Sequence, residues 1–326
     1  MKTFSLLFLA ASLLFINTFT ASQESPELQE AETLAASASK LLDDGKFDAA
    51  VAPARRALEI REKLLPANDI RISASLSTLG KVYFSKKDFK AAREIFQRLL
   101  QNQEQNLGPD NIRLAETLDW LAVLQFQAGK PNDAETSYKR ALALREKSFG
   151  SNHERVARSL FQLAEFYRSR RQFDLAVDYY KRALYGYGKL SDTYQAELER
   201  VSDGFYCVAY ESNQPEITKD LQAIWREISG ASEPEAGQVL NGRALSLPIP
   251  AYPASAKVHR YAGVVVVKVL VNKEGKVSTA KDMCNGPPYL REAAVDAAMK
   301  ARFSPTKLSG MPVKVYGVIF YNFVAR

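Results

Sequence analysis

The chain has 326 residues, of which 46% are hydrophobic and 25% charged, so it is too long for one small domain and too apolar for wholesale disorder. Its formal net charge of +7 is uneven: residues 23–229 carry 30 basic and 31 acidic side chains, whereas residues 230–326 carry 13 and 6. The basic second part suits an acidic peptide, an anionic lipid headgroup or a cell-wall polymer.

Residues 1–22 have the features of a secretory signal peptide. Lys2 supplies a positive start, residues 4–19 form a largely apolar run of 16 residues, and Thr20-Ala-Ser22 places small residues at a cleavage position. We therefore expect export, which argues against a nucleic-acid partner. The run is shorter than the roughly 20 residues of a spanning helix, which favours cleavage. The alternative is an uncleaved inner-membrane anchor, since the leader has no alanine-x-alanine site.

Four helical units follow, spaced 42 residues apart over residues 31–198. Small residues recur where paired helices would approach closely, and large residues recur where they would interlock. This pattern resembles the tetratricopeptide repeat. The long second helix and the loops at 107–111 and 149–153 resemble the kinesin-light-chain type. The recurring positions are Leu34, Leu76, Leu118 and Leu160; Ala50, Ala92, Ala134 and Ala176; Ala57, Leu99, Ala141 and Ala183; and Phe96, Tyr138 and Tyr180.

A fifth, degenerate unit at residues 199–228 is expected to cap the solenoid, because the last repeat would otherwise expose its apolar face. Residues 230–247 are rich in Gly, Ala, Ser, Glu and Pro and are predicted to be a linker. The predicted organisation is a signal peptide (1–22), a repeat domain (23–229), this linker and a C-terminal domain (248–326).

The C-terminal domain is predicted to be α+β. Residues 263–271 form a strand with alternate valines on one face, and Gly275 closes a hairpin to a second strand at 276–283. A helix with an alanine-rich stripe follows, and its small side chains would let it lie close to the valine face. The last strand is predicted at 313–323.

The order of short motifs in this region resembles the TonB C-terminal domain. The motifs are Pro250-x-Tyr-Pro-x-x-Ala256, Gly263 before the valine run, Gly275-Lys-Val277, the alanine-rich helix, Arg302-Phe-x-Pro305, Gly310-x-Pro-Val313 and Tyr321-x-Phe323. The resemblance implies a periplasmic domain that adds a short segment of an outer-membrane receptor to its sheet. TonB proteins carry a long proline-rich spacer before this domain, whereas here the repeats stand in its place.

The last strand is the predicted partner-binding site, because a free edge offers a row of N–H and C=O groups to an added strand. The alternative is an edge protected by the linker or by a second copy, which would make the chain a dimer through this domain. The candidate residues are Val313, Lys314, Val315, Tyr316, Val318, Phe320 and Tyr321.

A second candidate surface is a tyrosine cluster in the fourth repeat. Tyr179, Tyr185 and Tyr187 fall outside the consensus core positions and could line a peptide-binding groove. Packing in the core or against the cap is the favoured alternative.

No catalytic arrangement is found, and we predict a non-enzymatic protein without a cofactor or metal. His153 and His259 stand apart from other potential ligands, and the chain has no glycine-rich phosphate loop. Cys207 and Cys284 are predicted to be two isolated buried thiols, with an inter-domain disulfide as the alternative.

These features predict a cell-envelope protein that binds other proteins. The solenoid would dock one partner, and the C-terminal domain would pair with an extended segment. Two alternatives remain: a TonB-type energy transducer, which requires a retained N-terminal anchor, and an envelope scaffold whose basic domain binds cell-wall polymer.

Overall fold

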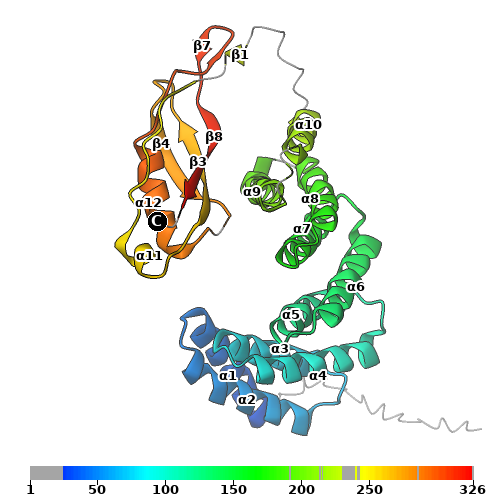
Figure 1. The fold of residues 1–326 in the computed structure, drawn as a ribbon. Helices are drawn as coiled ribbons and strands as arrows, with labels where there is room; N and C mark the ends of the chain where they lie inside the picture. The colour runs from blue at the N-terminus through cyan, green and yellow to red at the C-terminus, as the bar shows by residue number, and fades with distance from the viewer. Residues whose placement is uncertain are drawn as a thin grey trace, which may run out of the picture. The chain divides into compact units, whose positions relative to one another are not determined.

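The computed structural model describes residues 25–190, 192–212, 214, 216–229, 239–240, 243–284 and 286–324 (Figure 1). The predicted signal peptide and most of the predicted linker lie outside these residues. The chain divides into two compact units, Met1–Gly108 and Pro109–Arg326. Among the described residues, no helix has both the length and the apolar character needed to cross a membrane.

The first unit consists of helix pairs: α1 (Pro26–Asp43) with α2 (Phe47–Leu64), and α3 (Ile70–Ser85) with α4 (Phe89–Leu107). Small residues permit close packing, because Ala50 and Ala92 are fully buried. A Cβ on Gly80 would lie 2.8 Å from the Phe96 ring. The predicted alternation of small and large residues is confirmed in this unit.

The start of α3 shows how side chains fix a helix end. The Asp69 carboxylate accepts a hydrogen bond of 2.9 Å from the backbone N–H of Arg71 and lies 2.8 Å from its guanidinium. The hydrogen bonds from the Arg71 side chain lower the pKa of Asp69 to about 2.

The helices of the second unit are α5 (Leu114–Gln127), α6 (Pro131–Phe149), α7 (Glu154–Ser169), α8 (Phe173–Gly188), a 3-10 turn (Asp192–Tyr194), α9 (Gln195–Glu211) and α10 (Ile217–Ser229). They share one hydrophobic core in which Ala134 and Ala176 are fully buried. Both α9 and α10 pack on α8. The degenerate fifth unit therefore covers the apolar side of the fourth.

The C-terminal domain contains an antiparallel sheet in the order β4 (Val277–Asp282), β3 (Gly263–Val271) and β8 (Val315–Phe323). The helix α12 (Pro288–Met299) covers one face, as the alanine stripe predicts. The main residues of this core are Val265, Val267, Val269, Val271, Leu290, Ala294, Ala297, Ala298, Ala301, Ile319, Tyr321 and Phe323. The predicted solenoid followed by a small α+β domain is confirmed.

Gly275 is required where the β3–β4 hairpin meets the rest of the domain. Its φ of 78° lies in the left-handed region, and a Cβ there would be 1.9 Å from the carbonyl oxygen of Phe303. The backbone of this turn therefore touches a segment 28 residues further along the chain.

The last strand begins two residues later than predicted. Val313 and Lys314 lie before β8, because the N–H of Val313 donates to the carbonyl oxygen of Thr306 (2.9 Å). Short strands precede it: β6 (Lys307–Leu308) pairs with β7 (Met311–Pro312) and with β1 (Val239–Leu240), and β2 (Ala244–Ser246) pairs with β5 (Arg302–Phe303). These short pairings were not predicted from the sequence. A five-residue helix, α11 (Ala254–Val258), completes the domain.

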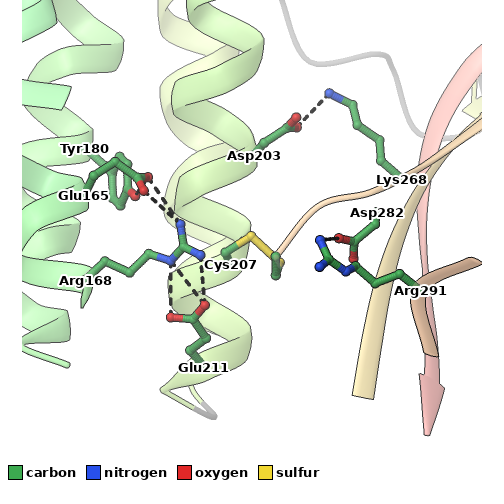
Figure 2. Close-up of a disulfide and its surroundings, with 10 residues drawn as sticks. Glu165, Arg168, Tyr180, Asp203, Cys207, Glu211, Lys268, Asp282 and Arg291 are labelled. Atoms are coloured by element: carbon green, nitrogen blue, oxygen red, sulfur yellow. Dashed lines mark hydrogen bonds and ion pairs between the residues drawn. A yellow bond between two sulfur atoms is a disulfide. The ribbon is translucent and has the colours of Figure 1, made fainter. Parts of the chain in front are cut away.

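The prediction of two isolated thiols is wrong. Cys207 on α9 and Cys284, just after β4, form a disulfide with a Cα–Cα distance of 5.3 Å (Figure 2). The bond joins the last repeat unit to the C-terminal domain. Neither half of the chain could reveal it alone, because the two cysteines meet only when α9 lies beside the sheet.

Candidate binding surfaces

Strand β8 presents a free backbone edge. Among the described residues it pairs only with β3, from Gly263 opposite Phe323 to Val271 opposite Val315. Its other side carries no strand there, so part of its backbone is available for strand addition.

The side chains of β8 alternate between the core and the outer face of the sheet. Ile319 and Tyr321 are buried against α12, whereas Tyr316 and Phe320 are 60% and 57% exposed. Val315 and Val318 are half-buried, and Lys314, before the strand, is exposed. Of the seven predicted residues, Tyr316 and Phe320 are therefore the two large apolar side chains on the strand that a partner can reach most readily.

A groove of about 800 Å³ runs beside the second half of β8. Residues 319–324 form one wall, and residues 247–250 with Tyr252 and Lys257 form the other. Tyr252 packs edge-on against Phe323, with ring centroids 6.1 Å apart. Ile249 is 93% exposed. An extended peptide on the β8 edge would have apolar side chains beside it.

Tyr321 lies in this wall but directs little of its side chain to solvent. Its hydroxyl is buried and has no hydrogen-bond partner among the described residues. Burial raises its pKa, so the group stays neutral. An unpaired buried hydroxyl costs stability, and this makes the position a useful probe of the domain.

The structure does not bring the three candidate groove tyrosines together as a surface. Tyr187 is 2% exposed and packs on Tyr194, so its assignment to a groove is wrong. The Tyr185 hydroxyl donates to Glu227 of α10 (2.7 Å), which raises its pKa and ties α8 to the cap. Only Tyr179 is half-exposed without such a tie to the cap, and its ring stacks on Tyr167 at 5.3 Å.

Helix α9 makes contacts on two of its faces, and neither set of contacts was predicted from the sequence. On one face, Gly204 lets the helix approach α8 closely, because a Cβ there would be 2.6 Å from the Tyr180 hydroxyl. On the same face, Glu211 accepts a hydrogen bond of 3.0 Å from Arg168 of α7. Tyr180 donates to Glu165, and burial raises the Tyr180 pKa. This face fixes α9 to the repeats.

The other face of α9 contacts the C-terminal domain through residues spaced i, i+4 and i+7, of which Figure 2 shows Asp203 and Cys207. Asp203 lies 2.7 Å from the ammonium of Lys268, Cys207 carries the disulfide, and the Tyr210 ring lies 5.7 Å from the Phe320 ring. The Lys268 ammonium also lies 5.0 Å from the centre of the Tyr316 ring. This face therefore touches the outer side of β3 and β8.

No group of three or more His, Cys, Asp or Glu side chains within the described part of the chain is arranged to hold a metal ion. His153 instead accepts a hydrogen bond from the Arg155 backbone at the start of α7. His259 stacks on Tyr289, with ring centroids 5.8 Å apart.

Known families match the chain in two parts. Models of the tetratricopeptide repeat match residues 41–70, 71–147 and 114–187, and a model of the Gram-negative bacterial TonB protein C-terminal matches residues 248–324. The chain thus carries tetratricopeptide repeats followed by a TonB C-terminal domain. No curated protein matches it in sequence.

Solved structures show the same helical fold. BtubC (BKLC) from P. vanneervenii is 20% identical, with a TM-score of 0.52 over 69% of this chain and 94% of that one. Kinesin-light-chain TPR-like repeats from Podosopora anserina are 17% identical, with a TM-score of 0.53 over 64% of this chain and all of the other. At these identities the likeness shows the fold and nothing of the partners.

Proposed function

We propose that this protein is a non-enzymatic component of the Gram-negative cell envelope that binds an extended peptide segment along the edge of β8. The free edge carries the proposal, since its backbone groups lie beside a groove with exposed apolar walls. Main-chain pairing would supply affinity, and pockets for alternate side chains would supply selectivity. A segment of an outer-membrane receptor is the partner that the TonB C-terminal match favours.

We place the protein in the periplasm, with the leader removed. The disulfide supports this, because such bonds persist in oxidising compartments. The repeats would bind a second protein, so that the chain connects two partners.

Photo-crosslinking in living cells tests the site. A photoreactive phenylalanine at position 320 should capture a partner, whereas one at Tyr289 should not. Tyr289 is the matched control, because it is 45% exposed on α12 in the same domain but does not line the groove beside β8. Equal capture at both positions, or capture at Tyr289 alone, would contradict the proposal.

The exposed lysines of the β3–β4 hairpin support a second candidate function, cell-wall binding. Lys273, Lys276 and Lys281 are all exposed, and Lys268 is engaged by Asp203. Retention of the full chain on purified cell wall, lost when these three lysines are changed to glutamine, would favour this scaffold over strand addition.

A further inference from the structure

We propose that the Cys207–Cys284 disulfide is a thiol-sensitive latch, which holds the outer face of the β4–β3–β8 sheet against α9 and releases it on reduction. The proposal concerns the coupling between the two domains and does not depend on what β8 binds.

The first observation concerns the polar and ring contacts that join α9 to the sheet in the described part of the chain. They include the ion pair of Lys268 with Asp203, a longer approach of Lys268 to Glu199 (3.9 Å), and the ring contact of Tyr210 with Phe320. Pairs of this kind each contribute little on their own. The covalent bond therefore carries much of the docking.

The second observation is the position of the bond between these contacts. Cys207 lies one turn after Asp203 and one turn before Tyr210 on α9. The bond joins cysteines 77 residues apart, so it lowers the conformational entropy of the state in which the two domains are undocked. Breaking it should lower the population in which all three side chains face the sheet.

The third observation is that the two sulfurs are unequally accessible. Cys207 is 1% exposed, whereas Cys284 is only half-buried. A thiolate from a dithiol reductant would attack the sulfur of Cys284. That step forms a mixed disulfide, breaks the Cys207–Cys284 bond and leaves Cys207 as a thiolate that takes up a proton. The second thiol of the reductant then releases Cys284 and becomes part of the oxidised reductant.

Release would uncover apolar surface on both α9 and the outer face of the sheet. Val266, on the outer face of β3, is 1% exposed in the docked state, and Tyr206 and Tyr210 on α9 are half-buried. Burial raises the pKa of both tyrosines, as expected for rings in a covered interface. The reduced form would present this surface next to the β8 edge.

Lysine acylation of the full chain reports directly on the latch. The side chain of Lys268 is 18% exposed and ion-paired, so a water-soluble acylating reagent should modify it slowly in the oxidised protein. After treatment with dithiothreitol, the rate at Lys268 should rise severalfold. Lys273 and Lys276 are the internal controls, because both are exposed in the same hairpin, and their rates should not change.

The double variant Cys207→Ser/Cys284→Ser gives the second arm. Lys268 of this variant should be acylated fast without reductant. Lys273 and Lys276 should react at the same rates as in the parent. If this variant fails to fold, the reduced wild-type chain still provides the measurement.

Three results would overturn the proposal. One is the same Lys268 rate in oxidised and reduced protein. Another is a bond that dithiothreitol reduces only after denaturation. The third is mass-spectrometric detection of two free thiols in protein isolated from the envelope without reductant.

Discussion

The repeats and the C-terminal domain differ in how completely they bury their apolar side chains. In the repeats, small residues such as Ala92 and Ala134 are fully buried at helix contacts. Of the seventeen large hydrophobic side chains that are exposed in the described residues, twelve lie within residues 245–324. That region is far shorter than the repeats, so exposed apolar side chains are denser there, and two of them, Tyr316 and Phe320, lie on β8. The repeats therefore bury most of their large apolar side chains in the fold, whereas the C-terminal domain leaves more of them exposed, as the proposed peptide binding requires.

The largest expected loss of stability tests how far the C-terminal domain depends on contacts between residues that are far apart in the sequence. Gly275→Ala should destabilise this domain by about 3 kcal/mol or more, because the new Cβ would clash with the Phe303 carbonyl at a positive φ. Hydrogen exchange of β3 and β8 measures the loss. Gly310→Ala is the matched control: its φ is 81°, but a Cβ there meets nothing within 4 Å, so it should cost only about 1 kcal/mol. Equal losses would mean that the close approach is unimportant.

The repeats should respond to overpacking instead. Ala92→Leu and Ala134→Leu should each lower the free energy of unfolding by about 1–3 kcal/mol, because neither site has room for three more carbon atoms. Urea denaturation followed by circular dichroism measures this. Ala49→Leu is the control, since Ala49 is exposed on α2 and should change little. Parent-like unfolding of both core variants would refute the assigned helix contacts.

A pH titration tests the helix end in the first unit. The pKa of Asp69 is lowered to about 2 in the folded chain, so its ion pair stabilises the fold above the unfolded pKa near 4. That contribution should fade as the pH falls from about 4 towards 2. We expect a loss of about 1 kcal/mol, since the pair is partly exposed. Asp69→Asn keeps an N-cap but should flatten this part of the profile. An unchanged profile would show that the pair contributes nothing.

The smallest expected effect has the opposite sign. Tyr321→Phe removes a buried hydroxyl that has no partner among the described residues, so it should leave the stability unchanged or raise it by up to about 1 kcal/mol. Thermal unfolding of the sheet domain measures the change. A clear loss of stability would show that the hydroxyl has a partner, such as a water molecule.

Local patterns predicted most of this structure. The 42-residue period identified the helix pairs because each alanine or aromatic position repeats the same neighbour contact. The valine alternation likewise predicted β3 and the face that α12 covers. The start of β8 was misplaced because the N–H of Val313 bonds to Thr306, which no alternation of side chains reveals.

The candidate sites were harder to predict from the sequence. The contacts of α9 with the sheet, including the disulfide, depend on how a capping unit meets a separate domain, so the 42-residue repeat pattern does not mark Asp203, Cys207 or Tyr210. The spacing of these residues at one side of a helix could have suggested a polar and aromatic stripe, but not its partner. Tyr187 was misassigned because its ring packs on Tyr194, in the turn before α9, a contact that the repeat pattern does not predict.

The central claim is that β8 accepts a peptide by backbone pairing. The segment captured at position 320 would be synthesised in three forms: unmodified, and N-methylated at either of the two alternating sets of amides. Calorimetric titration of the full chain should show that one methylated form binds about a hundredfold more weakly, since about three ladder hydrogen bonds are lost. The other form, whose methyl groups point away from β8, should bind like the unmodified peptide. Equal affinity of all three forms would contradict strand addition.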